Sequence, residues 1–211
     1  MTREQDVDII ARAREVVAAE AEAVGRLAAQ LDDGLLSVVR LLLDCQGHVL
    51  VAGAGTSRAV AQRFAHLLSC CGTPALPISA ADALHGGAGA VTSRDVVYII
   101  SKGGESEEVN RFAAIARERG ARVIAQTEAP TSSLAAMADA VFVVRTVGEV
   151  DPYGMVATGS SLVNSAACDV LCVLLLELRQ YSQEAFGQTH PGGAVGQTLR
   201  RQAPQVPNTD Q

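Results

Sequence analysis

The sequence predicts an α/β protein: a three-layer αβα sandwich built on a five-stranded parallel sheet. Five short apolar runs, rich in β-branched residues, alternate along the chain with stretches of helical periodicity. These runs lack the polar alternation of half-exposed strands, so helices are expected to cover both faces of the sheet. Glycine-rich loops follow two of the runs, and in such folds ligands bind where loops leave the carboxyl ends of the strands.

The composition indicates one domain, which we expect to span 1–200, followed by a disordered polar tail over 201–211. Seventeen basic and 23 acidic residues give a net charge of −6, which disfavours nucleic acid or an anionic membrane as a partner. Five cysteines without a C-x-x-C pair indicate a reduced, cytoplasmic protein. The N-terminus has no apolar leader pattern, and the most apolar stretches are too short to span a bilayer.

Two helices precede the first strand. Apolar residues recur at helical spacing over 6–30, where alanine is frequent. Asp32-Asp33-Gly34 forms a turn or cap, and a second helix follows over 35–43. Neither helix belongs to a β/α repeat, so we expect both to pack across the domain or against another subunit.

The first strand, over 48–52, runs into the loop GAGTSR at 53–58, and a helix follows from 59 to 71. Arg58 stands where the dinucleotide fingerprint G-x-G-x-x-G needs its third glycine, which disfavours an NAD-dependent enzyme. The loop still brings hydroxyl groups to a helix N-terminus, which suits an anion. Its candidate binding residues are Gly55, Thr56 and Ser57.

The next strand-like apolar segment, at 74–78, and a short helix over 79–84 lead into the loop HGGAG at 85–89. Its glycines make this a flexible, ligand-facing type of loop. His85 is the group in it that can carry chemistry.

The central strand, over 96–100, leads into SKGGESEE at 101–108, which has the outline of a phosphate cradle. Glycines let the backbone approach a ligand without a Cβ clash, and free N–H groups at the start of a helix attract an anion. Lys102 is the only lysine in the chain. The alternative is a plain β-to-α turn with a solvated lysine. The expected phosphate-binding residues are Ser101, Lys102, Gly103, Gly104 and Ser106.

The rest of the chain adds, in order, a helix over 109–119, a strand over 122–125, a turn over 126–130, a short helix over 132–138 and a strand over 140–144. A polar, glycine-broken loop at 146–160 crosses the same sheet edge, and a long helix over 161–181 follows. Cys168 and Cys172 lie one turn apart on that helix; we interpret them as small core residues because no third metal ligand is evident nearby.

Taken together, these loops resemble the sugar isomerase (SIS) domain family, and within it the arabinose 5-phosphate isomerase branch. The resemblance covers about 32–197. The motifs that carry it are GAGTS at 53–57, HGGAG at 85–89, SKGGESEEV at 101–109, the loop at 149–160 and THPGGAVG at 189–196. It implies a phosphosugar aldose–ketose isomerase that needs no metal or organic cofactor and works as a homo-oligomer, a tetramer in the family.

Two positions depart from the family pattern. Gly103 replaces the second serine of the phosphate loop, and Thr56 replaces a lysine that the arabinose 5-phosphate isomerases carry in the first loop. The second change keeps an alternative open: a non-catalytic sugar-phosphate-binding regulatory protein.

Aldose–ketose isomerisation needs a base that moves a proton between two carbons through an enediolate. It also needs a group that opens the sugar ring and stabilises the oxyanion, a role that suits histidine. The candidates, all of which match acid–base positions of the isomerases by resemblance, are Glu149, His190, Glu105 and His85. We favour Glu149 and His190 as the catalytic pair.

Overall fold

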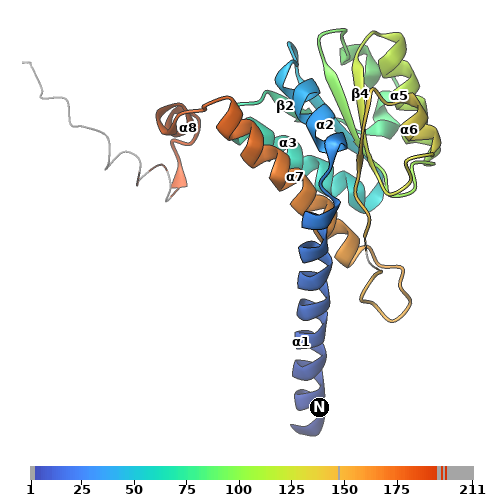
Figure 1. The fold of residues 1–211 in the computed structure, drawn as a ribbon, viewed down its shortest axis with the longest axis vertical. Coiled ribbons are helices and arrows are strands. Elements are labelled where there is room, and N and C mark those ends of the chain that lie inside the picture. Colours follow the sequence, from blue (N-terminus) through green and yellow to red (C-terminus); the bar gives the residue numbers. More distant parts are fainter. Residues whose placement is uncertain (1–2, 147, 194–195, 197, 199–211) are drawn as a thin grey trace, which may run out of the picture.

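The computed structural model describes residues 3–146, 148–193, 196 and 198. Over these residues, five strands alternate with helices in three layers (Figure 1). The expected fold class, an αβα sandwich with a parallel sheet, is confirmed. The tail expected at 201–211 and part of the motif THPGGAVG at 189–196 lie outside the described residues.

The strands are β1 (Val49–Gly53), β2 (Ala75–Pro77), β3 (Val96–Ile100), β4 (Arg122–Thr127) and β5 (Ala140–Val143). All pair in parallel, in the order β2-β1-β3-β4-β5. From β1 the chain moves outward to β2, and from β3 it moves outward to the other edge, so the direction reverses between β1 and β3. Gly53 lies opposite Ile100, and the loops that follow these two strands therefore leave the sheet side by side. This switch point is where open α/β sheets form a ligand crevice.

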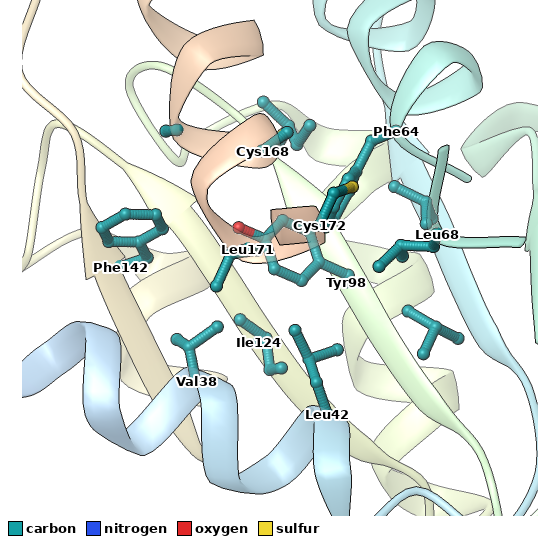
Figure 2. Packing of buried hydrophobic residues seen from close by; sticks show 14 of the residues in the cluster. Val38, Leu42, Phe64, Leu68, Tyr98, Ile124, Phe142, Cys168, Leu171 and Cys172 are labelled. Carbon is teal, nitrogen blue, oxygen red and sulfur yellow. The ribbon is translucent and has the colours of Figure 1, made fainter. Parts of the chain in front are cut away.

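Helices cover both faces of the sheet. One layer contains α2 (Asp33–Leu43), α3 (Gly55–Cys70) and α7 (Thr158–Leu178), which pack on Val49, Tyr98 and Ile124. Figure 2 shows side chains of these helices meeting around Tyr98. The Tyr98 ring lies edge-on to the ring of Phe64, with the two ring centres 4.9 Å apart.

The opposite layer contains α4 (Ala80–Ala83), the 3-10 turn η2 (Gly87–Ala90), α5 (Glu107–Glu118) and α6 (Ser133–Met137). These elements pack on Leu50, Val97 and Ile99, the alternate residues of the same strands. Successive strand residues point to opposite faces, which explains why a strand covered on both sides is continuously apolar.

The N-terminal segment folds as α1 (Arg3–Gly25) and the 3-10 helix η1 (Arg26–Gln30), and Asp32 caps α2 by accepting the N–H of Gly34 at 2.9 Å. Figure 1 shows α1 as a rod that extends away from the sheet. Its exposed apolar residues include Val7, Ile9, Ile10 and Val17.

Several bounds differ from the sequence expectations, and three helices show the differences that matter for the site. α3 begins at Gly55 rather than 59, α7 spans Thr158–Leu178 rather than 161–181, and α8 (Gln183–Thr189) was not expected. Both longer helices start in glycine- and hydroxyl-rich sequence, which reads locally as loop. α8 is short and contains a glycine, so its periodicity is weak; Ser182 caps it by accepting the N–H of Ala185 at 3.1 Å.

By length and composition, α7 could cross a membrane, which corrects the expectation that every apolar stretch is too short. The buried core helix of a folded domain meets the same criterion. Here α7 packs against α1, α2 and α3, and its residues Cys168, Leu171 and Leu175 are fully buried.

Candidate active site

The first wall of the crevice is the loop from β1 to α3. A Cβ on Gly53 would lie 2.8 Å from the backbone of Ser57, so this close turn requires glycine. The N-cap residue of α3, Ala54, offers no side-chain cap, so the first N–H groups of the helix are left for another acceptor. Gly55 and Thr56 are exposed at this turn and Ser57 is half-buried, as expected for residues that face an anion.

The second wall is the loop from β3 to α5. Gly104 has a φ of +67°, and a Cβ there would lie 2.1 Å from the Ser132 hydroxyl, so the loop packs directly on the start of α6. Asn110 supports it from α5 by donating from Nδ2 to the Gly104 carbonyl at 3.1 Å. The hydroxyls of Ser101 and Ser106 have no hydrogen-bond partner among the described residues, and Ser106 does not cap α5. Both are therefore free to bind a ligand.

Lys102 and Glu149 meet at this edge. Lys102 Nζ lies 3.3 Å from Glu149 Oε1, although 47 residues separate the two in sequence. The lysine side chain is 48% exposed and the glutamate only 5%, so the ammonium reaches solvent and the carboxylate lies beneath it.

Glu149 also receives hydrogen bonds from the first turn of α7. The Ser160 N–H donates to Oε2 at 3.2 Å, and the Ser160 side chain also favours the charged form of the carboxyl. Burial raises the pKa of Glu149, but the Ser160 bonds and the Lys102 ammonium outweigh it, so the pKa lies below its usual value. The carboxylate is therefore ionised and able to accept a proton at neutral pH.

Glu105 is held differently. It lies before α5, which begins at Glu107, and turns to α6 instead. Its two oxygens accept the Ser133 N–H at 2.8 Å and the Ser133 hydroxyl at 2.7 Å. These two bonds lower the pKa of Glu105. The carboxylate caps α6, so the structure brings Glu105 near the phosphate loop but directs its oxygens to Ser133.

His190 ends α8 and stacks on Phe186 with ring centres 3.8 Å apart. Its Nδ1 lies 3.0 Å from the Phe186 carbonyl, and its Nε2 lies 3.3 Å from the thiol of Cys70. Cys70 is the last residue of α3, a 16-residue helix whose first turn borders the crevice. Such a helix is about 24 Å long, so one chain does not bring His190 to Glu149.

His85 is exposed on the segment that joins α4 to η2, and its backbone N–H donates to the Asp82 carbonyl at 3.0 Å. The expected flexible loop at 85–89 is in part the 3-10 turn η2.

A cavity of about 290 Å³ lies between α3 and the segment after β2. Its polar lining residues are Arg58, Gln62, Ser79 and Asp82.

Sequence reasoning missed several polar groups around Glu149. Ser160 was assigned to a loop, Gln126 to the turn after the strand at 122–125, and Asn164 was not singled out, although all three are buried. Thr158 Oγ1 and Asn110 Oδ1 are also buried, without a partner in the described structure. The signal that could have identified Ser160 as part of a helix is the run Thr158-Gly159-Ser160, because hydroxyls and glycine are typical of a helix start.

Cys168 and Cys172 are core residues, as expected: both are buried, and burial raises the pKa of both thiols. In the part of the chain that the structure describes, no three His, Cys, Asp or Glu residues gather in a group that could hold a metal ion.

The SIS domain model matches residues 42–174, a range that includes all five strands and most of the covering helices. The chain belongs to the SIS domain family, and the resemblance drawn from its loops is confirmed.

Among curated proteins, the arabinose 5-phosphate isomerase KpsF of Escherichia coli is 33% identical over 195 residues. That alignment covers 92% of this chain and 60% of the relative, so the chain spans about three fifths of the relative's length.

Two solved structures align with this chain over their entire length. A candidate sugar-phosphate isomerase of Listeria monocytogenes is 32% identical with a TM-score of 0.85, covering 91% of this chain and 100% of its own. A protein of Escherichia coli CFT073, solved in complex with arabinose 5-phosphate, is 28% identical with a TM-score of 0.84, covering 90% of this chain and 100% of its own. A sugar-phosphate ligand is thus bound by a protein of this fold and family.

Proposed function

We propose that the chain is a phosphosugar aldose–ketose isomerase that acts through an enediolate, similar to the arabinose 5-phosphate isomerases. The observation that carries this proposal is the 3.3 Å pair of Lys102 and Glu149 at the switch point of the sheet. It combines a cation on the phosphate loop with a buried carboxylate that can act as a base. The family relationship and the arabinose 5-phosphate complex of a relative support the same class of substrate.

The phosphate of the substrate would bind between the two glycine loops. Its oxygens would accept hydrogen bonds from the Ser101 and Ser106 hydroxyls, the N–H groups at 103–105 and the Lys102 ammonium. The first turn of α3, with Gly55, Thr56 and Ser57, would close the other side. Lys102 compensates for the hydroxyl that Gly103 does not provide.

Glu149 would be the base. In the open-chain aldose phosphate, its carboxylate takes the proton from C2, and the C1 carbonyl oxygen becomes the oxyanion of an enediolate. The same carboxyl then returns the proton to C1, while the C2 hydroxyl gives its proton to the C1 oxygen, which yields the ketose. Glu105 remains the second candidate for this role.

Phosphate binding would also prepare the base. A phosphate dianion attracts the Lys102 ammonium more strongly than a single carboxylate does. As the ammonium moves toward the phosphate, Glu149 loses one of the groups that lower its pKa and becomes a stronger base.

Ring opening requires an acid–base group that one chain does not bring to Glu149. We propose a homo-oligomer, a tetramer as in the resembled family, with active sites near subunit interfaces. His190 or His85 of a second copy would complete the site. Exposed apolar side chains support such an assembly: α7 carries Leu162, Val173 and Leu178, and the segment after Glu149 carries Tyr153, Met155 and Val156.

The remaining expectations accompany this proposal. The protein would act in carbohydrate metabolism in the cytoplasm, with no metal or organic cofactor and no nucleic-acid or membrane partner. Thr56, in place of the family lysine, favours one alternative: a regulatory protein that binds a sugar phosphate without converting it.

The test is to incubate the purified protein with a panel of pentose to heptose aldose phosphates in D₂O and follow each by proton NMR. The proposal expects ketose formation with deuterium incorporated at C1 or C2 for at least one sugar, and loss of both in Glu149→Gln. Binding detected by thermal shift, with no exchange for any sugar, would leave the regulatory alternative.

A further inference from the structure

A chain of buried polar side chains crosses the core beneath Glu149. Tyr98 on β3 and Gln126 on β4 are fully buried, and Asn164 on α7 is 8% exposed. They lie on the face of the sheet that is otherwise lined by apolar residues, and Figure 2 shows Tyr98 surrounded by these apolar side chains. Buried amides and hydroxyls are costly unless they are hydrogen-bonded, so their bonds must account for their presence.

These bonds run in one direction, from the sheet to the first turn of α7. The Tyr98 hydroxyl donates to Gln126 Oε1 at 2.6 Å. Gln126 Nε2 donates to Asn164 Oδ1 at 2.6 Å and to the Asn164 carbonyl at 3.2 Å. Asn164 Nδ2 donates to the Ser160 carbonyl at 2.8 Å. The two amides therefore have defined orientations, because each donor meets an acceptor.

The chain ends at the carboxylate. Ser160 accepts from Asn164 through its carbonyl and donates to Glu149 Oε2 through its N–H at 3.2 Å. α7 has no side-chain cap of its own at Ala157, so Glu149 fills that role. The position of Glu149 thus depends on where the first turn of α7 is held.

We propose that Gln126 and Asn164 are positioning residues for Glu149: they hold the first turn of α7 against β4, so that Ser160 meets the carboxylate beside Lys102. This inference rests on the proposed function, in which Glu149 is the base. A proton transfer between carbons tolerates little displacement of the base, which gives the buried amides a role beyond packing.

The opposite end of α7 offers a matched control. There, Arg179 Nε donates to the buried Thr73 hydroxyl at 3.0 Å and Arg179 also bonds the Leu42 carbonyl at 2.8 Å. Thr73→Val removes one buried hydrogen bond that anchors α7, as Gln126→Leu and Asn164→Leu do, but it lies at the end remote from Glu149.

The first readout needs no substrate: the titration of the Glu149 carboxyl by ¹³C NMR, assigned by its loss in Glu149→Gln. Asn164→Leu and Gln126→Leu are expected to raise the Glu149 pKa because the Ser160 bonds to the charged form weaken, whereas Thr73→Val leaves it unchanged. These substitutions do not change the other charged and polar groups near Glu149 and the two amides. Those groups are Lys102 after β3, Arg12 of α1 on the Val150 carbonyl, and Tyr98 and Cys168 beside Gln126.

The second readout is turnover on the best sugar phosphate. We expect kcat to fall about tenfold in Asn164→Leu, about fivefold in Gln126→Leu and about twofold in Tyr98→Phe, with KM nearly constant. Tyr98→Phe keeps the ring and removes only the outermost hydrogen bond, so it tests the gradient even if a leucine variant fails to fold.

The proposal is overturned if the leucine variants lower only the melting temperature, as Thr73→Val does, with wild-type titration of Glu149 and wild-type kcat. If the wild-type protein isomerises no sugar, the proposed function fails, and the titration still decides whether the amides position Glu149.

Discussion

Glu149 and Glu105 show how the same local device gives two different environments. Each carboxylate caps the start of a helix, Glu149 at α7 and Glu105 at α6, and each has a lowered pKa. Glu149 lies beneath Lys102 with 5% of its side chain exposed, whereas both oxygens of Glu105 bond Ser133 at an exposed site. Both carboxylates cap a helix, but only Glu149 also contacts a cation of the proposed phosphate loop, and that contact makes it the candidate base.

The largest expected effect separates the two carboxylates. Glu149→Gln keeps the size and polarity of the side chain but removes the base, so kcat should fall by about a hundredfold or more with little change in KM. Glu105→Gln should lower kcat by less than about tenfold. Steady-state kinetics on the best sugar phosphate measure both. The opposite ranking would make Glu105 the base.

The distance between His190 and Glu149 in one chain predicts complementation between subunits. His190→Ala should slow cyclic substrates more than open-chain ones if His190 opens the ring. Mixing Glu149→Gln with His190→Ala should restore up to about a quarter of wild-type activity, because some mixed interfaces contain both intact groups. Subunits are mixed after mild dissociation, and oligomer size is checked by light scattering. A monomer at micromolar concentration, or mixtures that stay inactive, would argue against a shared site.

Substitutions in the phosphate loop should weaken binding rather than chemistry. Lys102→Met, Ser101→Ala and Ser106→Ala should each cost about 1–3 kcal/mol of binding free energy, the value of a hydrogen bond to a charged group. Calorimetric titration with a sugar phosphate measures the loss. Lys102→Met should also raise the pKa of Glu149. Wild-type affinity in all three variants would show that this loop does not bind the phosphate.

The smallest expected effect is on stability in acid. Both carboxylates have a lower pKa in the folded chain than in the unfolded one, so they stabilise the fold above their unfolded pKa of about 4.5. That contribution is lost as the pH falls through the folded pKa. Glu149→Gln and Glu105→Gln should therefore each flatten the fall in melting temperature below about pH 4.5, because each removes a carboxylate with a lowered pKa. A fall as steep as that of the wild type in both variants would contradict the lowered pKa values.

The sequence was sufficient for the sheet because a strand covered on both faces is apolar throughout, and that pattern is local. It was also sufficient for the phosphate loop, where glycine, lysine and serine gather within a few residues after β3. The placement of Glu149 was not local. It depends on Ser160, in a helix turn whose sequence is typical of a loop, and on Gln126, whose buried amide nitrogen donates to Asn164, 38 residues away.

His190 was placed least well by sequence. Its motif suggested the active edge, but α8 carries it to the far end of α3, where it meets Cys70. Such docking depends on contacts between helices distant in sequence, which periodicity does not reveal. Gln126 similarly follows an apolar strand run and was read as the start of a turn, because a polar residue after such a run is usually exposed.

The central claim is that Glu149 takes the proton from C2. Its most direct test is the rate at which the C2 proton of the best aldose phosphate exchanges with D₂O, compared among wild type, Glu149→Gln and Glu105→Gln. We expect rapid exchange in the wild type, exchange within about tenfold of it in Glu105→Gln, and exchange reduced by about a hundredfold or more in Glu149→Gln. Exchange in Glu149→Gln at the wild-type rate would contradict the claim.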